Sequence, residues 1–453
     1  MTKRLSYIKG AEDVAFNLAK EEGLDAVVSR VRRDLSDVLG SKNVSFLMGS
    51  GCSSYWSDSA DGEVGIPTMG PMARSFFALE EGECSITADE RKASLEVLGL
   101  DLDAEVYSKN LEALMEVLFG YRFVLANNAK DELKSSEELV ESLISKVTRF
   151  VLDKCRAGKF STGDTTVQHL YESFYRKLIH RDRALPRPWV FTTNYDLFSE
   201  TAMDRLGIPY INGFQGSIER RFNPAVFRYA LAEQLDLSSR KWSSVDSLIY
   251  FAKLHGSVSW ESRDDGLFPV VETSPQLVTH ENLLIYPTPA KQNASFASPY
   301  SDMFREFQTR VARDQSVLIT VGYSFSDEHV NNIIFQALTI PTFRLVAFVD
   351  PGANATVKKL RELHDPRIWI IGTESASQES AESHPAGTPQ FPVDPVETSA
   401  DADAGDIDVN WRGHYFSTIV NEFFVADQSD DANHAIGNVI AQLFNQKNED
   451  SDE

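Results

Sequence analysis

Two short polar segments follow apolar runs and carry side chains suited to acid–base chemistry. Asn194 and Asp196 follow the β-branched and aromatic run 190–193, and His255 follows residues 250–254. An imidazole titrates near neutrality and can act as a general base, while carboxamide and carboxylate groups can orient the hydroxyl or amide groups of a ligand. The structural alternatives are that Asp196 caps the following helix and that His255 is a buried structural residue.

Three other segments have the composition of nucleotide-binding turns. The run 44–48 ends in MGSGCSS, whose glycines would let backbone amides approach a phosphate, although a tight turn without a ligand fits equally well. Ser324 follows Gly322 at the end of another run, where its hydroxyl could bind phosphate or ribose or could cap a helix. Asp350 ends a third run, and a carboxylate there could accept hydrogen bonds from ribose or adenine.

Composition and charge narrow the class of protein. The 453 residues can bury a large core, and a formal net charge of −23 disfavours general binding to nucleic acid or to an anionic membrane. Cys52, Cys84 and Cys155 lie far apart without a CxxC pair, so we expect neither a disulfide framework nor a zinc site. The first residues do not resemble a signal peptide, and no run reaches the ~18 apolar residues of a spanning helix. We therefore expect a cytoplasmic protein.

The elements that would position these residues alternate between strand and helix. Apolar runs predict strands within residues 44–48, 188–196, 248–256, 282–288, 316–324, 344–350 and 367–372. Helical periodicity predicts helices at 25–39, 197–206, 303–313, 327–338 and 356–363. This alternation predicts an α/β fold with a doubly wound, mostly parallel sheet covered on both faces.

Helical patterns without strand signals fill residues 80–183, which we expect to form an inserted α-helical module. The predicted organisation is thus 1–79 (an N-terminal helix and the first part of the α/β domain), 80–183, 184–373, a linker 374–408 and a C-terminal part 409–453. The linker is acidic and contains no Lys or Arg, so we expect it to be disordered and dispensable for catalysis. Helices are expected at 415–424 and 435–444, before an acidic tail.

Taken in order, the motifs resemble those of the sirtuin superfamily. The segments GSG (49–51), GIP (65–67), TNYD (193–196), HG (255–256) and GYS (322–324) are similar to the sirtuin Gly-Ala-Gly, Gly-Ile-Pro, Gln-Asn-Ile-Asp, His-Gly and Gly-Thr-Ser motifs. The resemblance covers about residues 44–70 and 188–372. It implies a Rossmann-like sheet that binds NAD.

The resemblance also implies that NAD is the substrate and is cleaved between nicotinamide and ribose. Asn194 would then bind near the ribose or position the attacking water, and His255 would act as general base or polarise a ribose hydroxyl. Asp196 would orient the nicotinamide amide or stabilise its turn. The implied NAD-binding residues are Gly49, Ser50, Gly51, Cys52, Ser53, Pro67, Thr68, Thr193, Gly322, Tyr323, Ser324 and Asp350.

Differences from the deacylating sirtuins point to particular relatives. The four-Cys zinc ribbon of those enzymes has no counterpart in this sequence, and Thr68-Met69 replaces the Phe-Arg that usually follows Gly-Ile-Pro. The motifs look more like the bacterial sirtuin-like NADases of antiphage defence. The size, the insertion and GIPTM resemble the sirtuin-like subunit that pairs with a HerA-type hexameric ATPase.

We therefore expect a homo-oligomer, with self-contacts from the inserted module, that joins such an ATPase. We expect no membrane partner and no direct binding of nucleic acid.

Three alternatives remain open from the sequence. The chain could be an NAD-dependent protein deacylase that uses the same pocket, although the missing zinc ribbon disfavours this. It could be a sensor that binds NAD or ADP-ribose without turnover, although the presence of both Asn194 and His255 favours chemistry. It could also be mainly an assembly scaffold whose inserted helices make the interfaces.

Overall fold

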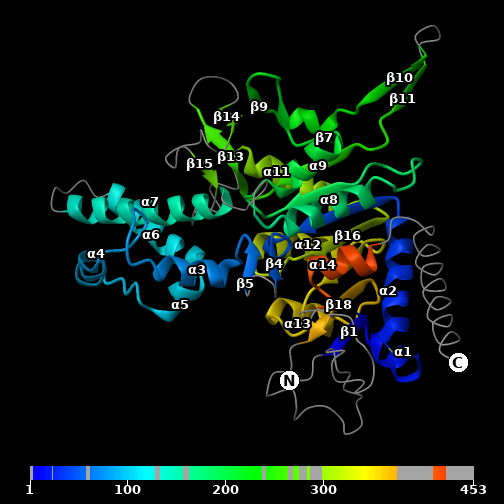
Figure 1. Ribbon diagram of the computed structural model, residues 1–453, viewed down its shortest axis with the longest axis horizontal. Helices are drawn as coiled ribbons and strands as arrows, with labels where there is room; N and C mark the ends of the chain where they lie inside the picture. Colours follow the sequence, from blue (N-terminus) through cyan, green and yellow to red (C-terminus); the bar gives the residue numbers. More distant parts are fainter. Residues whose placement is uncertain are drawn as a thin grey trace, which may run out of the picture.

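The computed structural model describes residues 4–22, 24–57, 62–127, 133–156, 163–236, 241–263, 269–274, 283–285, 298–374 and 412–424. Within these ranges the main sheet has the strand order β2-β1-β18-β17-β16-β3-β6-β12-β7 (Figure 1). The strands from β18 to β7 are parallel, and β1 and β2 are antiparallel additions at one edge. The predicted α/β, doubly wound, mostly parallel fold is confirmed. Most of the expected linker and the helix expected at 435–444 lie outside the described residues.

The chain builds this sheet outward in both directions from β3 (Asn43–Met48). β6 (Trp189–Thr192), β12 (Ile249–Lys253) and β7 (Tyr210–Ile211) lie on one side of β3. β16 (Ser316–Val321), β17 (Arg344–Phe348) and β18 (Ile368–Glu374) lie on the other side. The connections therefore reverse direction between β3 and β16, which is where ligands bind in doubly wound sheets.

The central strands are buried on both faces, which explains their mostly apolar sequence. Along β16, Val317 and Ile319 face one apolar layer and Leu318 faces the other. Helices α2 (Leu24–Leu39) and α8 (Thr166–Leu178) cover the first layer. Helices α11 (Tyr300–Val311), α12 (Glu328–Leu338) and α13 (Ala355–Glu362) cover the second.

Several strands in the structure have no counterpart among the predicted elements. β1 (Arg4–Lys9) and β2 (Glu12–Asp13) precede the first helix, α1 (Val14–Glu22). β4 (Ser54–Ser57) pairs with β5 (Gly62–Gly65), which ends on the first residue of the GIP segment. A second, antiparallel sheet has the order β15-β13-β14-β9-β8, and a separate hairpin of β10 (Ala232–Asp236) and β11 (Lys241–Ser244) extends away from the main sheet (Figure 1).

The strand expected within 282–288 belongs to this second sheet and not to the parallel one. It is β15 (Leu283–Ile285), and it pairs antiparallel with β13 (Gly256–Ser262). The other strands of that sheet are β8 (Phe214–Gln215), β9 (Arg220–Phe222) and β14 (Val270–Glu272). The misassignment has a physical cause, because a short apolar run indicates a strand without indicating which distant strand it pairs with.

The inserted helices form a layer beside the main sheet, to its left in Figure 1. Those within the predicted module 80–183 are α4 (Ala88–Ala93), α5 (Glu105–Lys109), α6 (Leu111–Ala126) and α7 (Lys134–Arg156), and α3 (Met69–Phe77), which precedes residue 80, packs with them. The apolar faces of α3, α6 and α7 meet in one core, where Phe76 contacts Phe150 edge-on, whereas α4 and α5 contain no buried residue. Helix α8 differs from them, because Phe174 packs against Phe46 of β3 and thus directly on the sheet.

The C-terminal described segment returns to the main sheet. It contains the short helical turns α14 (Phe416–Thr418) and η6 (Ile419–Phe423), within the predicted helix 415–424. Nδ1 of His414 accepts a hydrogen bond from the backbone N–H of Thr373 on β18 at 3.1 Å. Burial against the sheet lowers the pKa of His414 to about 4, so its neutral form is the one that docks.

We expect acid to loosen this C-terminal segment. The pKa of His414 is lower in the folded chain than the ordinary 6.5, so its contribution to stability is full above pH 6.5 and is lost as the pH falls toward about 4. Protonation removes the acceptor for Thr373 N–H. Hydrogen exchange at 416–423, corrected for intrinsic rates, should increase over this range relative to α12. The variant His414→Gln, which keeps an acceptor but cannot titrate, should lose the pH dependence; an unchanged dependence would contradict the assignment.

Candidate active site at the carboxyl ends of the parallel strands

Four neighbouring parallel strands end at the same level. In register, Val321 of β16 pairs with Met48 of β3, Met48 with Thr192 of β6, and Thr192 with Lys253 of β12. The turns that follow these strands therefore leave the sheet side by side at its carboxyl edge. The sequence-predicted residues of the glycine turn, the TNYD segment, the HG segment and the GYS segment are brought together at this edge.

The glycine turns after β3 and β16 pack directly against each other. The N–H of Gly51 donates to the carbonyl of Gly322 at 3.0 Å. A Cβ on Gly49 would lie 2.4 Å from the Gly322 carbonyl oxygen, and one on Gly322 would lie 2.5 Å from the backbone N of Cys52. Gly322 also has a φ of +61°, a conformation that favours glycine. The glycines are thus required by the contact between the turns, which sets the two turns at a fixed separation at the switch point.

Most amides of the first turn donate within the protein. Gly49, Gly51, Cys52 and Ser53 each donate to a backbone carbonyl, whereas the N–H of Ser50 has no acceptor in the described part of the chain. Backbone amides at such a turn can bind a phosphate. The anion-binding capacity of this turn therefore rests on the N–H of Ser50.

We expect Gly51→Val to weaken NAD binding strongly while the protein still folds. A Cβ at this position would lie 3.0 Å from Cα of Gly322, so a β-branched side chain must push the two turns apart. Calorimetric titration of NAD against the variant measures the effect. Gly120→Val is the matched control, because a Cβ on Gly120 in α6 would meet nothing within 4 Å. Unchanged affinity in a folded Gly51→Val protein would contradict the placement of NAD beside this turn.

Asn194 is held against the glycine turn by its side-chain nitrogen. Nδ2 donates to the Gly49 carbonyl at 2.9 Å, to Ser53 Oγ at 3.0 Å and to Tyr171 OH at 3.4 Å. A carbonyl can only accept, so the contact with Gly49 fixes which end of the carboxamide is the nitrogen. Within the described residues no donor is bonded to Oδ1 of Asn194. This oxygen is therefore the acceptor that Asn194 can offer to a ligand hydroxyl or water.

Asp196 stabilises the turn that carries Asn194. Oδ1 of Asp196 accepts from the N–H of Phe198 at the start of α9 (Phe198–Leu206), and Oδ2 accepts from Ser53 Oγ at 2.7 Å. Asp196 is buried, and it thus links the turn after β6 to the turn after β3. This geometry fits the turn-stabilising role that the sequence allows for Asp196. The N-cap position of α9 is taken by Leu197, so Asp196 is not the cap residue itself.

His255 lies one residue beyond Leu254, whose N–H donates to the carbonyl of Thr192 at the end of β6. Its Nε2 is 2.9 Å from Oδ2 of Asp327, close enough for an ion pair when the ring is protonated, although the geometry falls short of an aligned hydrogen bond. Oδ1 of Asp327 accepts from the N–H groups of His329 and Val330 and caps α12. The His255 side chain and the helix that follows β16 are therefore fixed together at the edge of the site.

The other predicted NAD-binding residues divide into two groups. Cys52 and Tyr323 are buried in the scaffold: the Cys52 thiol donates to the Val321 carbonyl, and Tyr323 OH donates to Asn331. Burial raises the pKa of both groups, so each stays protonated. The side chain of Ser53 is likewise occupied within the protein.

The second group lies at the rim of the strand ends. Ser324 is exposed and its Oγ contacts Ser326 Oγ at 2.9 Å, and Oδ1 of Asp350 after β17 accepts from Gly352 N–H. Thr193 donates its N–H to the Met48 carbonyl, and Thr68 with Pro67 leads into α3. The GIP segment is joined to the glycine turn, because Ile66 N–H donates to the Ser53 carbonyl at 2.8 Å.

Two residues of this edge were not singled out from the sequence. Tyr171 of α8 contacts Asn194 and Ser53, and Lys253 of β12 lies beneath the turn after β6. Tyr171 follows an ordinary helical apolar pattern, so its sequence carries no signal of its position at the site. Lys253 did carry one, since a lysine inside an apolar strand that ends in His-Gly must be paired if it is buried.

Comparison with known families supports a sirtuin-like assignment. Residues 188–368 match the family model described as a SIR2-like domain, which spans β6 to the start of β18 and includes the TNYD, HG and GYS segments. The match does not include the glycine turn after β3, which the structure places against the GYS turn. Domains of this family are in general NAD-dependent enzymes, so an NAD-related activity is supported for this chain. No curated protein matches the chain.

Two further observations concern metals and membranes. In the described ranges Cys52, Cys84 and Cys155 are free thiols, and no group of three or more His, Cys, Asp or Glu side chains could hold a metal ion. The expectation that the protein holds no zinc stays a prediction. None of the described helices is long and apolar enough to span a membrane.

Proposed function

We propose that the protein hydrolyses NAD to nicotinamide and ADP-ribose. The observation that carries this proposal is the anchoring of Asn194 Nδ2 on the Gly49 carbonyl, which leaves Oδ1 as an acceptor at the carboxyl edge of the sheet, within the segment that matches a SIR2-like domain. The ends of β3, β6, β12 and β16 supply the other groups at the same level. NAD would lie across these ends as the substrate.

The proposed reaction breaks the bond between the nicotinamide nitrogen and C1 of the ribose. Nicotinamide leaves with the bonding electron pair, and a water oxygen bonds to C1 and gives up a proton. Asn194 Oδ1 would accept a hydrogen bond from that water or from a ribose hydroxyl. His255 would take up the proton or polarise a ribose hydroxyl, and the carboxylate of Asp327 would stabilise the imidazolium that results.

The test is to incubate the purified chain with NAD and to quantify nicotinamide and ADP-ribose, with and without an acetylated lysine peptide. The proposal expects equal amounts of both products without any peptide. Release of nicotinamide only with the peptide, together with loss of the acetyl group, would support a deacylase instead. Tight NAD binding without any product would support a sensor.

We further propose that the activity serves antiphage defence in an assembly with a HerA-type ATPase. The resemblance of the motifs supports this, and the inserted module exposes large apolar side chains that could contact a neighbouring copy: Leu95, Val97, Val106, Phe123 and Val124. Light scattering of the chain, alone and with such an ATPase, tests the assembly. A monomer of about 51 kDa that is fully active on NAD would overturn it.

A further inference from the structure

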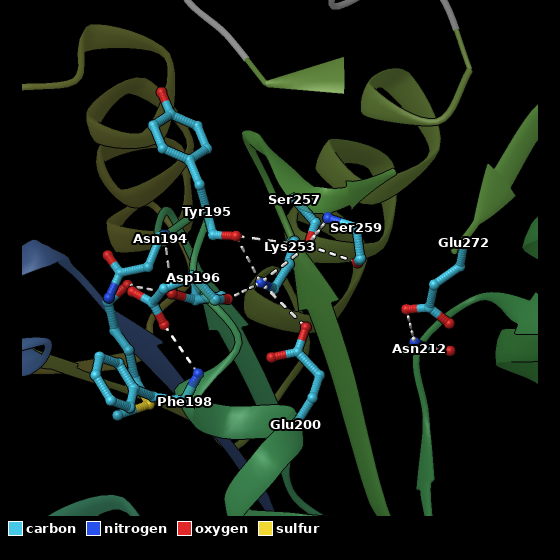
Figure 2. A network of polar contacts seen from close by, with 12 residues as sticks. Asn194, Tyr195, Asp196, Phe198, Glu200, Asn212, Lys253, Ser257, Ser259 and Glu272 are labelled. Atoms are coloured by element: carbon cyan, nitrogen blue, oxygen red, sulfur yellow. Dashed lines mark hydrogen bonds and ion pairs between the residues drawn. The ribbon is translucent and has the colours of Figure 1, made fainter. Parts of the chain in front are cut away.

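A buried ammonium group lies beneath the turn that carries Asn194. Lys253 is the last residue of β12, and only 2% of it is exposed. Its Nζ donates to the carbonyls of Asp196 and Tyr195, to Oγ of Ser257, and lies 3.0 Å from a carboxylate oxygen of Glu200 (Figure 2). A buried charge is tolerated only when it is paired and hydrogen-bonded, and Lys253 meets both conditions.

The contacts of Lys253 join the segments that hold the two proposed catalytic residues. Tyr195 and Asp196 follow Asn194 directly, and His255 follows Lys253 by two residues. The turn between β6 and α9 is irregular, so its carbonyls need donors from outside the turn. Lys253 supplies donors to two successive carbonyls, and Val258 N–H also donates to that of Tyr195 at 3.0 Å. These hydrogen bonds thus fix the position of the turn that carries Asn194 relative to β12, the strand that precedes His255.

A purely structural explanation is that Lys253 serves to neutralise Glu200. Glu200 is buried in α9, and burial raises its pKa to about 7 even beside the lysine. Its second carboxylate oxygen has no hydrogen-bond partner among the described residues. Three of the four contacts of Lys253, however, go to groups other than Glu200. Those contacts would be needed even if Glu200 were neutral.

We propose that Lys253 is a positioning residue for NAD hydrolysis, an inference that rests on the proposed function. Its ammonium holds the carbonyls of Tyr195 and Asp196 and thereby sets Asn194 relative to His255. Loss of these contacts lets the turn move while the glycine turns that face NAD remain in place. Turnover therefore depends on Lys253 more strongly than substrate binding does, because displacing a reacting group by about 1 Å can cost about 10²-fold in rate.

The double variant Lys253→Met/Glu200→Gln tests this proposal against the structural explanation. It leaves no unpaired buried charge, so its thermal unfolding should stay close to that of the wild type. We expect its kcat for nicotinamide release to fall about 10²-fold with little change in KM. Glu200→Gln alone keeps the ammonium and its carbonyl contacts but removes the carboxylate that pairs with it, so its thermal stability should fall while the folded protein keeps wild-type turnover. Lys146→Met is the matched control, since Lys146 also binds a backbone carbonyl and a carboxylate, those of Ser85 and Glu90, but lies in α7 of the inserted module.

A second variant keeps the proposal falsifiable if the double variant does not fold. Lys253→Arg retains a cation for Glu200 but cannot place one nitrogen among the same acceptors, so we expect kcat to fall here too. Wild-type kcat in either folded variant, beside an active wild type, would overturn the positioning role alone. Absence of nicotinamide release from the wild-type protein would overturn the proposed hydrolysis and the positioning role with it.

Discussion

Replacing Asn194 with alanine is expected to remove nearly all nicotinamide release. The substitution deletes Oδ1, the oxygen that we propose to orient the water or a ribose hydroxyl, and it deletes the anchor on the Gly49 carbonyl. Removing one preorganised polar contact from a transition state typically costs about 10²–10³-fold in kcat. The fold should survive, because Ser53 keeps its contacts with Tyr171 and Asp196. Quantifying nicotinamide at saturating NAD measures the loss.

Asn212→Ala provides a matched control for this experiment. Asn212 is also buried and also bonded to a side chain, Glu272, but it follows β7 and lies outside the proposed site (Figure 2). A loss of stability common to both variants would show in thermal unfolding, whereas the loss of turnover should be confined to Asn194→Ala. Near-normal turnover by a folded Asn194→Ala protein would remove Asn194 from the catalytic assignment.

The main sheet could be predicted because each of its longer strands has a recognisable local sequence pattern. β16 and β17 are buried on both faces, so each is a mostly apolar run followed by a turn and an amphipathic helix. The rule that ligands gather at the carboxyl ends of such strands then placed Asn194 and His255 at one edge, although they are 61 positions apart in the chain.

The rest of the site depends on contacts between distant segments, which no local pattern reports. Ser53 and Asp196 are separated by 143 positions, yet they share a 2.7 Å hydrogen bond. Tyr171 reaches the site from a helix that looks in sequence like any other amphipathic helix. The antiparallel sheet was missed for a related reason, because strands as short as β8 and β14 carry too few residues to show a period of two.

The structure also gives the glycines of the first turn a role that the sequence does not suggest, which is packing against the turn after β16. The sequence suggested that Gly49 and Gly51 let the backbone approach a phosphate. In the structure their first requirement is the approach of the Gly322 turn, and a Cβ on either would meet that turn. The motif thus specifies how two turns pack, and any ligand contact follows from that packing.

His255→Ala is expected to have the largest effect of any single substitution in the site. The imidazole is the one group at these strand ends that we propose to accept a proton, and removing an acid–base group typically costs about 10²–10⁴-fold in rate. Its ring also contacts Asp327 and lies near Phe304, so the alanine variant loses both. The initial rate of nicotinamide release at saturating NAD is the measurement.

Asp327→Asn distinguishes two roles of Asp327, its ion pair with His255 and its cap of α12. Asparagine can still accept from the N–H groups of His329 and Val330, so α12 should keep its cap, but it cannot stabilise a protonated His255. We expect Asp327→Asn to lose turnover in the same direction as His255→Ala, and the double variant to be no worse than His255→Ala because the two residues act as a unit. His329→Ala, which changes a histidine two residues beyond Asp327, should remain active. Strictly multiplicative losses in the double variant would show that Asp327 does not act through His255.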